Sequence, residues 1–499
     1  MSSILNKISY LRELSLPFNC YETGHTWTPS CTDAALTIGA TTFREALKIY
    51  GSLYVVSQIF SWKFDLKTFR KTLESTLTSS CFLSFNAFSF ISIFCGIRRI
   101  MGKFYYLHCA YIPAFTASFL AILIERESRR QPLALYVINI ASETIFRMLV
   151  TRGYTQPLPQ GEVLIFSLTM GVLMYVIRKN GFSKDLVGMG MRFLLGSEEV
   201  KLQSNSEHLD PCKMKHNVIK ALNQKKINGK PLPLNNTAVN FATNFATFIS
   251  SVFQQGRKQL GQTPLVNFLK THPHHHSCPH AFSCPSYILK GFLQPFLVGY
   301  SARTAMHIFS SFQHIIKNPS LILRLLTNKQ NLSVGLSVGG FFGIFKLVSC
   351  LLRWVHNKDS EWHAIPAGLL AGLTMLINPN STVALYLAWK AVEIVYTIGV
   401  KKRVLPSIPG SILILYAAST ALLFYAAFME PHNLKPTYIR FLNRLTDNRL
   451  ELINRHVMDV FGTHASKMYH DFWPDLDPRY TSRAFQETIL VWLAGSPER

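Results

Sequence analysis

STLTSSCFLSFNAFSFISIFCGI (residues 75–97) decides the fold class, because it contains no Asp, Glu, Lys or Arg. An α-helix of about 20 apolar residues crosses the hydrocarbon layer of a bilayer, which is about 30 Å thick. A buried helix of a soluble protein rarely stays uncharged over such a length. The stretch therefore predicts a helix that spans a membrane.

Three further stretches lack charged residues in the same way: residues 104–124, 364–389 and 404–429. Of the 499 residues in the chain, 48% are hydrophobic and only 16% are charged, and the mean hydropathy is +0.17. A soluble protein carries about 25% charged residues, so this chain has too few charges to cover a water-facing surface. We predict an all-α fold, a polytopic membrane helical bundle.

The chain carries a formal net charge of +24 at pH 7. Its basic residues stand between the apolar stretches, as in IRRIMGK (97–103) and ERESRR (125–130). This scatter is typical of loops beside anionic lipid headgroups, whereas nucleic-acid binding needs a continuous basic face with interleaved aromatic residues. We therefore expect membrane lipids, and no nucleic acid, as partners. Residues 1–20 lack the apolar core of a secretory signal, so we expect insertion through internal spans.

The chain repeats itself at an offset of about 250 residues. ALYVINIASETIF (134–146) matches ALYLAWKAVEIVY (384–396), and a glutamate follows the tyrosine by seven residues in both copies. The repeat predicts two homologous halves, about 32–200 and 285–450, each with four or five membrane segments.

The regions around these halves differ in composition. The linker between them is rich in Lys, Asn and Pro and reads as flexible, and Phe241, Phe245, Phe248 and Val252 then recur at helical spacing. The predicted domains are an N-terminal Cys-containing cap (1–31), the first membrane half (32–200), a segment with the polar linker, an amphipathic helix and a His/Cys cluster (201–284), the second membrane half (285–450) and a C-terminal polar tail (451–499).

Glycines four residues apart mark a face for close helix packing. They are Gly335, Gly339 and Gly343 in VGLSVGGFFGIF, with Gly368 and Gly372 in PAGLLAGL. Such a face lets a second helix approach closely in lipid. We interpret it as intramolecular packing, and the alternative is the seam of a homo-oligomer or a pore.

Two pairs of charged residues fall within the predicted spans. Glu143 and Arg147 are four residues apart, and Lys390 and Glu393 are three apart, so each pair shares a helix face. A charge at membrane depth costs about 2.5–3.5 kcal/mol on insertion scales, and pairing offsets much of that cost. We interpret both as structural ion pairs, and the alternative is a site linked to a substrate or to protons.

A cluster of cysteine and histidine precedes each half, in NCYETGHTWTPSC (19–31) and HPHHHSCPHAFSC (272–284). A structural zinc site needs four Cys or His ligands in a closed tetrahedron, and the two clusters together could supply one site shared between the halves. We rank an unliganded surface cap first, a metal site second and a disulfide third, since disulfides need an oxidising compartment. Zinc is the one cofactor that the residues suggest, and the six candidate ligands are Cys20, His25, Cys31, Cys278, His280 and Cys284.

Several of these motifs resemble the transmembrane protein 135 family. They are NCYETGHTWTPSC, GKFYYLHCAYIPAFTASFLAILIERESRR (102–130), ASETIFRMLVTRG (141–153), LRWVHNKDSEWHAIPAGLLAG (352–372) and DVFGTHASKMYHDFWPDLDPRYT (459–481). Through its glycine ladder the chain is also distantly similar to the translocase superfamily of the mitochondrial inner membrane. The resemblance implies a multi-pass protein of peroxisomal and mitochondrial membranes, linked to mitochondrial fission with the dynamin-related GTPase, to peroxisome organisation and to lipid handling.

Three functions of different class follow. The leading expectation is a non-enzymatic organelle membrane protein that organises fission machinery or membrane contacts through exposed loops or residues 431–499. The alternative is a transporter or translocase-like pore for lipid or another solute. An enzyme is the least favoured, because no acyltransferase His/Asp pairing, nucleophile elbow or phosphate loop stands at a convincing position.

Overall fold

The computed structural model describes residues 15–61, 65–183, 185–200, 275–280, 283–311, 314–315, 318 and 320–495. The predicted amphipathic helix around residues 241–252 and most of the polar linker lie outside the described residues. The described chain is mostly helical, with one short antiparallel pairing of β1 (Ser15–Leu16) and β2 (Phe104–Tyr105). The predicted all-α fold is confirmed.

Six helical stretches among the described residues are long and apolar enough to cross a membrane. They are α4 (Leu66–Met101), α6 (Glu127–Thr151), α7 (Gly161–Asn180), Leu321–His356 with α14 (Leu321–Leu326) and α15 (Lys329–His356), α17 (Ser381–Lys401) and α18 (Ser411–Met429). Each sequence half supplies three of them, together with one shorter apolar stretch, Tyr111–Ile124 or Glu361–Ile377. The prediction of a polytopic membrane protein is confirmed, and residues 75–97 lie within α4.

Two of the uncharged stretches form shorter helices than their length suggests. In residues 104–124 the chain first forms β2 and a turn, so α5 (Tyr111–Ile124) has 14 residues, about 21 Å at 1.5 Å per residue. In residues 364–389, α16 (Ala364–Gly372) and η3 (Leu373–Ile377) end before Asn380, whose side chain caps α17 by accepting a hydrogen bond from the backbone N–H of Val383. An uncharged run therefore overestimates helix length where a strand or a cap interrupts it.

The chain forms two compact units, which divide at residues 162/163 and 379/380. Unit 1 is the described part of Met1–Glu162 and Asn380–Arg499, and unit 2 is the described part of Val163–Pro379. Each unit therefore contains segments from both sequence halves. The predicted halves describe the repeat in the sequence, and the compact units cut across it.

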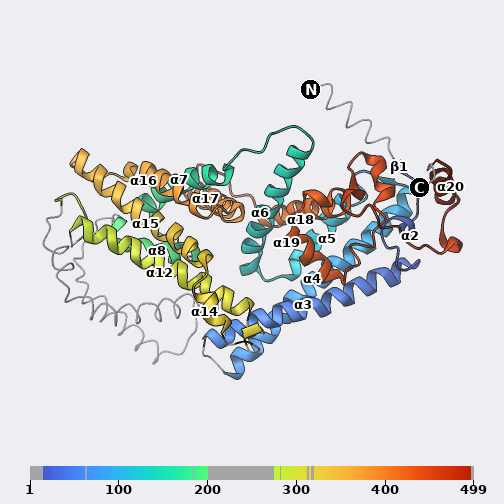
Figure 1. Cartoon of the computed structure of the whole chain (residues 1–499). Coiled ribbons are helices and arrows are strands. Elements are labelled where there is room, and N and C mark those ends of the chain that lie inside the picture. Colours follow the sequence, from blue (N-terminus) through green and yellow to red (C-terminus); the bar gives the residue numbers. More distant parts are fainter. Residues whose placement is uncertain are drawn as a thin grey trace. The chain divides into compact units, whose positions relative to one another are not determined.

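In unit 1, α3 (Cys31–Ser61) packs along α4, and α18 packs against α5 and α6 (Figure 1). Helix α17 also lies on α6. Thus α17 and α18 of the second half complete a bundle that the first half begins. Alanines on α5 and α18 are fully buried at this junction, among them Ala114, Ala117 and Ala421, and their small side chains allow close helix approach.

In unit 2, α12 (Cys284–Ser310) and α15 lie side by side (Figure 1), and α16 packs on α15. Helix α7 of the first half packs on α16, because a Cβ atom added to Gly368 would lie 2.7 Å from the carbonyl oxygen of Met170. Helix α8 (Leu186–Leu195) and η1 (Ser197–Glu199) complete this unit. Helix α7, the last long apolar helix of the first half, therefore belongs to unit 2, with α12, α15 and α16 of the second half. Helix α18, the last long apolar helix of the second half, belongs to unit 1, with α3 to α6 of the first half.

The turns after α6 and α17 show the repeat in backbone conformation. Gly153 (φ 75°) and Gln160 (φ 59°) stand 250 positions before Arg403 (φ 56°) and Gly410 (φ 75°). Residues other than glycine rarely adopt this left-handed conformation. Its recurrence at both positions indicates that the two copies keep the same turn.

The C-terminal region folds onto unit 1. After α19 (Pro436–Thr446) come η5 (His456–Phe461), η6 (Ala465–Met468), η7 (Pro478–Tyr480) and α20 (Arg483–Gly495). Ile453, Val457 and Phe461 are buried in the core of the unit. The described part of residues 451–499 is therefore an integral part of this unit, although its composition is polar.

Candidate functional site

Cys20, His25, Cys31 and Cys95 come together in unit 1, and we call them the first cluster. One ligand atom from each residue lies within 4.8 Å of those of the other three. Cys20 begins α2 (Cys20–Thr23), Cys31 begins α3, and Cys95 lies on α4 six residues before its end. The cluster therefore joins the N-terminal segment to the packed helices α3 and α4.

Local interactions fix the segment that carries the first ligands. The Asn19 side chain accepts a hydrogen bond from the backbone N–H of Glu22 (2.9 Å), and the Glu22 carboxylate accepts one from the backbone N–H of Asn19 (2.6 Å). This capping box satisfies both donors and starts α2. Gly24 follows, where an added Cβ would lie 2.6 Å from the Phe94 ring. Only glycine lets the chain pass α4 this closely.

The His25 ring is held through one of its two nitrogen atoms. The residue is fully buried, and its Nδ1 lies 2.8 Å from the carbonyl oxygen of Thr28. A carbonyl only accepts, so Nδ1 carries the proton and Nε2 keeps its lone pair. Nε2 is buried and has no hydrogen-bond partner among the described residues. A histidine fixed in this way is poised to bind a metal.

Cys278, His280, Cys284 and Cys350 come together in unit 2, and we call them the second cluster. Their ligand atoms also lie within 4.8 Å of one another, and all four residues are buried. The Sγ atoms of Cys278 and Cys284 are 3.9 Å apart, and Cys350 Sγ lies 3.6 Å from His280 Nε2. Cys284 begins α12, and Cys350 lies on α15 six residues before its end.

The structure brings together all six cysteine and histidine candidates, but in two groups of three instead of one shared group. Cys95 and Cys350 complete the groups, and sequence reasoning missed both because each lies within an apolar helix. The recurrence of Cys95-x-x-Arg98 as Cys350-x-x-Arg353 is the signal that could have found them. The eight described cysteines are all free thiols.

A buried ionic network adjoins the second cluster and was not expected from the sequence. The Glu199 carboxylate lies 2.7 Å from both the Arg178 and Arg353 guanidinium groups, and Arg353 also lies 2.9 Å from Asp359. The Tyr287 hydroxyl donates to Glu199 at 2.8 Å, and its ring stacks on His280. Burial, and then the charge of Glu199, raise the pKa of Tyr287 above its ordinary value. Tyr287 therefore stays a donor and links the network to a cluster residue.

The first cluster has different surroundings. Arg98 donates to the carbonyl oxygens of Phe18 (2.7 Å) and Pro17 (2.9 Å). From the C-terminal region, Asn454 donates to the Glu22 carbonyl at 2.9 Å, and the backbone N–H of Ser482 donates to the Glu22 carboxylate. Hydrogen bonds between the two terminal regions therefore hold this cluster in place.

The two predicted charge pairs lie in unit 1 and have different partners. Glu143 lies 2.7 Å from Arg147 and 3.2 Å from Lys435, so it faces two cations. Glu393 lies 2.9 Å from Lys390 and accepts a hydrogen bond from Gln131. Both glutamates are thus engaged by side chains of neighbouring elements.

The five predicted packing glycines all face helices of unit 2. Cβ atoms added to Gly335, Gly339 and Gly343 would lie 3.0, 2.7 and 3.1 Å from Phe296 or Phe292 of α12. Those added to Gly368 and Gly372 would meet Met170 and Ser167 of α7. Both faces are occupied within the unit, so a homo-oligomer would need another surface.

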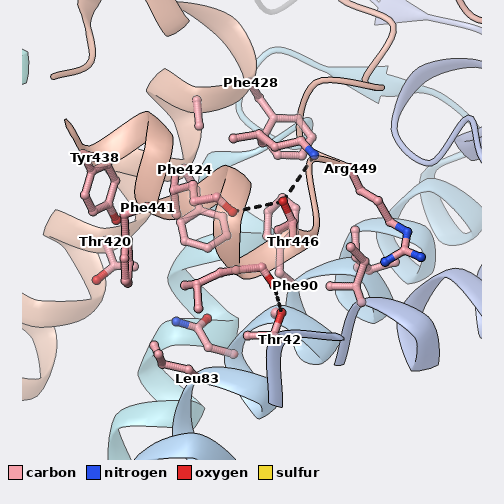
Figure 2. Close-up of a pocket in the computed structure, with 18 of the residues that line it drawn as sticks. Thr42, Leu83, Phe90, Thr420, Phe424, Phe428, Tyr438, Phe441, Thr446 and Arg449 are labelled. Carbon is pink, nitrogen blue, oxygen red and sulfur yellow. Dashed lines mark hydrogen bonds between the residues drawn. The ribbon is translucent and has the colours of Figure 1, made fainter. Parts of the chain in front are cut away.

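Unit 1 also contains an apolar cavity of about 170 Å³, which sequence reasoning did not identify. Figure 2 shows Phe90 of α4, Phe424 and Phe428 of α18, and Tyr438 and Phe441 of α19 around it. Most of its lining is apolar or aromatic, and Arg449 is the only charged residue among the lining side chains.

Two arginines lie at the cavity wall. Arg449 donates to the hydroxyl of Thr41 at 2.9 Å and is partly exposed. Arg455 lies behind the wall and donates to the carbonyl oxygens of Ala427 (3.1 Å) and Leu450 (2.8 Å), two lining residues. Burial lowers the pKa of Arg455 to about 10.

Comparison with known proteins gives one family. Residues 17–150 match the family model described as the N-terminal cysteine-rich region of Transmembrane protein 135. The matched region contains all four residues of the first cluster and confirms the resemblance that the motifs predict. No solved structure matches the chain, and the similarity to the translocase superfamily stays a prediction.

Proposed function

We propose, from the match of residues 17–150 to the cysteine-rich region of Transmembrane protein 135, that the chain is a member of that family and a non-enzymatic multi-pass protein of peroxisomal and mitochondrial membranes that binds lipid. The observation that supports lipid binding most directly is the apolar cavity of unit 1. Ligand sites are concave and mostly apolar, with few polar groups that orient the ligand. The cavity fits this description, and it lies among helices of membrane-spanning type.

The lining suggests how a lipid would be oriented. Hydrocarbon would contact Phe90, Phe424 and Phe428, which gains about 25 cal/mol for each Å² of apolar surface removed from water. Arg449 would attract an acidic headgroup, because a guanidinium binds carboxylate or phosphate in a fork of two hydrogen bonds. We propose an anionic amphiphile, such as a fatty acid, as the preferred ligand.

Photoaffinity labelling of purified full-length protein in detergent tests this proposal. A photoactivatable fatty acid should label peptides of α4, α18 or α19, and Leu83→Trp, which fills the cavity, should reduce labelling at least fivefold. Leu123→Trp is the matched control, because Leu123 is exposed on α5, outside the cavity lining. Arg449→Gln should weaken labelling by the fatty acid but not by a photoactivatable sterol. Equal labelling of Leu83→Trp and the wild type would contradict the proposal.

The proposed cellular role is the organisation of mitochondrial fission and of peroxisomes, with the dynamin-related fission GTPase as partner. The family assignment supports this role. Removal of the protein should change mitochondrial length and peroxisome number, and re-expression should restore both. Unchanged organelles, or a tagged protein found on neither membrane, would contradict it.

A second candidate function is transport through a translocase-like pore. It is favoured by Glu143, which is nearly buried between Arg147 and Lys435 in a unit of apolar helices. Purified protein in liposomes should then pass a lipid or another solute, and Glu143→Gln should abolish the flux at normal protein level. Wild-type liposomes without flux would exclude this function.

A further inference from the structure

The two Cys/His clusters share one design in both halves of the repeat. In each, a first cysteine and a histidine precede a cysteine that begins a long helix, Cys31 of α3 or Cys284 of α12. The fourth residue, Cys95 or Cys350, lies on the helix packed against it, six residues before the end of that helix. The spacing between the first two cysteines differs, yet both copies converge on three cysteines and one histidine.

We propose that the first and second clusters are two equivalent structural zinc sites, one in each repeat, each with three cysteine ligands and one histidine ligand. This proposal is independent of lipid binding. Tetrahedral zinc in proteins takes four such ligands, and Cys₃His is a common structural set. The clusters supply a complete set each, so neither needs a ligand from the other.

The distances fit this geometry. With Zn–S bonds of about 2.3 Å and Zn–N bonds of about 2.1 Å, neighbouring ligand atoms of a tetrahedron are about 3.6–3.8 Å apart. The observed separations are 3.9 Å between Cys278 and Cys284 Sγ and 3.6 Å between Cys350 Sγ and His280 Nε2. A disulfide would need about 2.05 Å.

An independent observation points to a metal at the first cluster. His25 Nε2 is buried without a hydrogen-bond partner among the described residues, which is unfavourable if nothing binds it. Its Nδ1 proton is held by the Thr28 carbonyl, as the outer-shell partner of a metal-bound histidine usually is. A zinc ion would satisfy the free nitrogen.

The surroundings also suit the charge of such a site. Zinc with three thiolates and a neutral histidine carries a net charge of about −1. Arg98 follows Cys95 by three residues and donates to the carbonyl oxygens of Phe18 and Pro17, just before Cys20 in the chain. Lys346 precedes Cys350 by four residues and lies 4.2 Å from the centre of the Tyr287 ring, which stacks on His280. Each site therefore has a basic side chain nearby.

Four protein ligands leave no open position, so these sites would be structural. Zinc at the first cluster would fasten α2, the start of α3 and the end of α4 to one point. Zinc at the second would do the same for residues 278–280, α12 and α15. Thiolate-rich sites also accept copper(I) and iron–sulfur clusters, so the test must identify the metal.

Elemental analysis of full-length protein, purified in detergent without chelator, tests the proposal. We expect two zinc ions per chain in the wild type, one in Cys95→Ser, one in Cys350→Ser and none in the double variant. Cys81→Ser is the matched control, because Cys81 lies exposed on α4 outside both clusters, and it should keep two. Three results would overturn the proposal: protein without zinc, protein that holds iron or copper instead of zinc, or a zinc content of two ions that neither variant lowers.

Alkylation of the wild type covers the case in which a variant fails to fold. A maleimide should label Cys81 at once and spare the six cluster cysteines until a strong zinc chelator is added. Cluster cysteines that react before chelation, or only after a reductant, would overturn the proposal.

Discussion

The two clusters have the same ligand set and the same helix positions, but their surroundings have little in common. The first cluster is held by hydrogen bonds from the terminal regions, with Glu22 accepting from backbone and hydroxyl donors. The second adjoins a buried network in which Glu199 faces Arg178 and Arg353. The repeat therefore keeps the cluster and the helix pair, whereas each copy has acquired its own neighbours.

The largest expected effect comes from removal of one ligand. Structural zinc binds with an apparent free energy of about 10–16 kcal/mol, so Cys95→Ser should destabilise unit 1 and Cys350→Ser should destabilise unit 2 by several kcal/mol each. Hydrogen exchange of the purified variants should rise in the affected unit alone. A rise of the same size in both units for either variant would contradict two independent sites.

The second largest effect is expected at the acidic residues beside the clusters, whose replacement should lower stability by different amounts. Glu199→Gln leaves two buried arginines with less counter-charge, which costs about 3–5 kcal/mol. Glu22→Gln should cost about 1–2 kcal/mol, because its partners are neutral donors and an amide oxygen still accepts from one of them. Thermal unfolding measures both, and Glu74→Gln, an exposed partner of Arg126, should change stability by at most about 1 kcal/mol. Equal losses for Glu22 and Glu199 would contradict the difference.

The helix pairs of the two units should respond differently to added methyl groups. Gly339→Ala places a Cβ 2.7 Å from Phe296 and should destabilise the protein by about 1–3 kcal/mol. Gly96→Ala on the corresponding helix α4 meets nothing within 4 Å, so it should leave stability unchanged or raise it by up to about 1 kcal/mol. Chemical unfolding compares the two, and a loss at Gly96 would show that α4 also needs a close approach.

The smallest effect concerns the repeated glutamates. Glu143 faces two cations and Glu393 faces one, so Glu143→Gln should cost about 1 kcal/mol and Glu393→Gln less than that. The melting temperature in detergent measures both. If both variants keep normal stability but lose transport or the organelle phenotype, the pairs serve a function beyond structure.

Part of this fold could be predicted from the sequence. The uncharged stretches 75–97 and 404–429 locate α4 and α18, because charge is excluded from lipid-facing helices. Residues 104–124 and 364–389 were less informative, since a strand and the Asn380 cap interrupt them without any charge. The placement of α7 in unit 2, and of α17 and α18 in unit 1, could not be predicted, because a repeat does not say which copy each helix packs against.

The two Cys/His clusters could also be predicted only in part from the sequence. The dense clusters at 19–31 and 272–284 supplied three ligands of each site. Cys95 and Cys350 lie within apolar helices, where only the repeated Cys-x-x-Arg spacing marks them, and the structure shows that each belongs to a cluster. The apolar cavity has no sequence signature either, because its lining comes from α3, α4, α6, α18 and α19 and from the loops beside them, in separate parts of the chain.

X-ray absorption spectroscopy at the zinc edge of the purified full-length protein tests whether the two clusters bind zinc. We predict an average shell of three sulfur atoms at about 2.3 Å and one nitrogen atom at about 2.0 Å, with a metal content of two ions per chain. A shell of oxygen and nitrogen atoms, or a protein without zinc, would contradict the assignment of the two clusters as zinc sites.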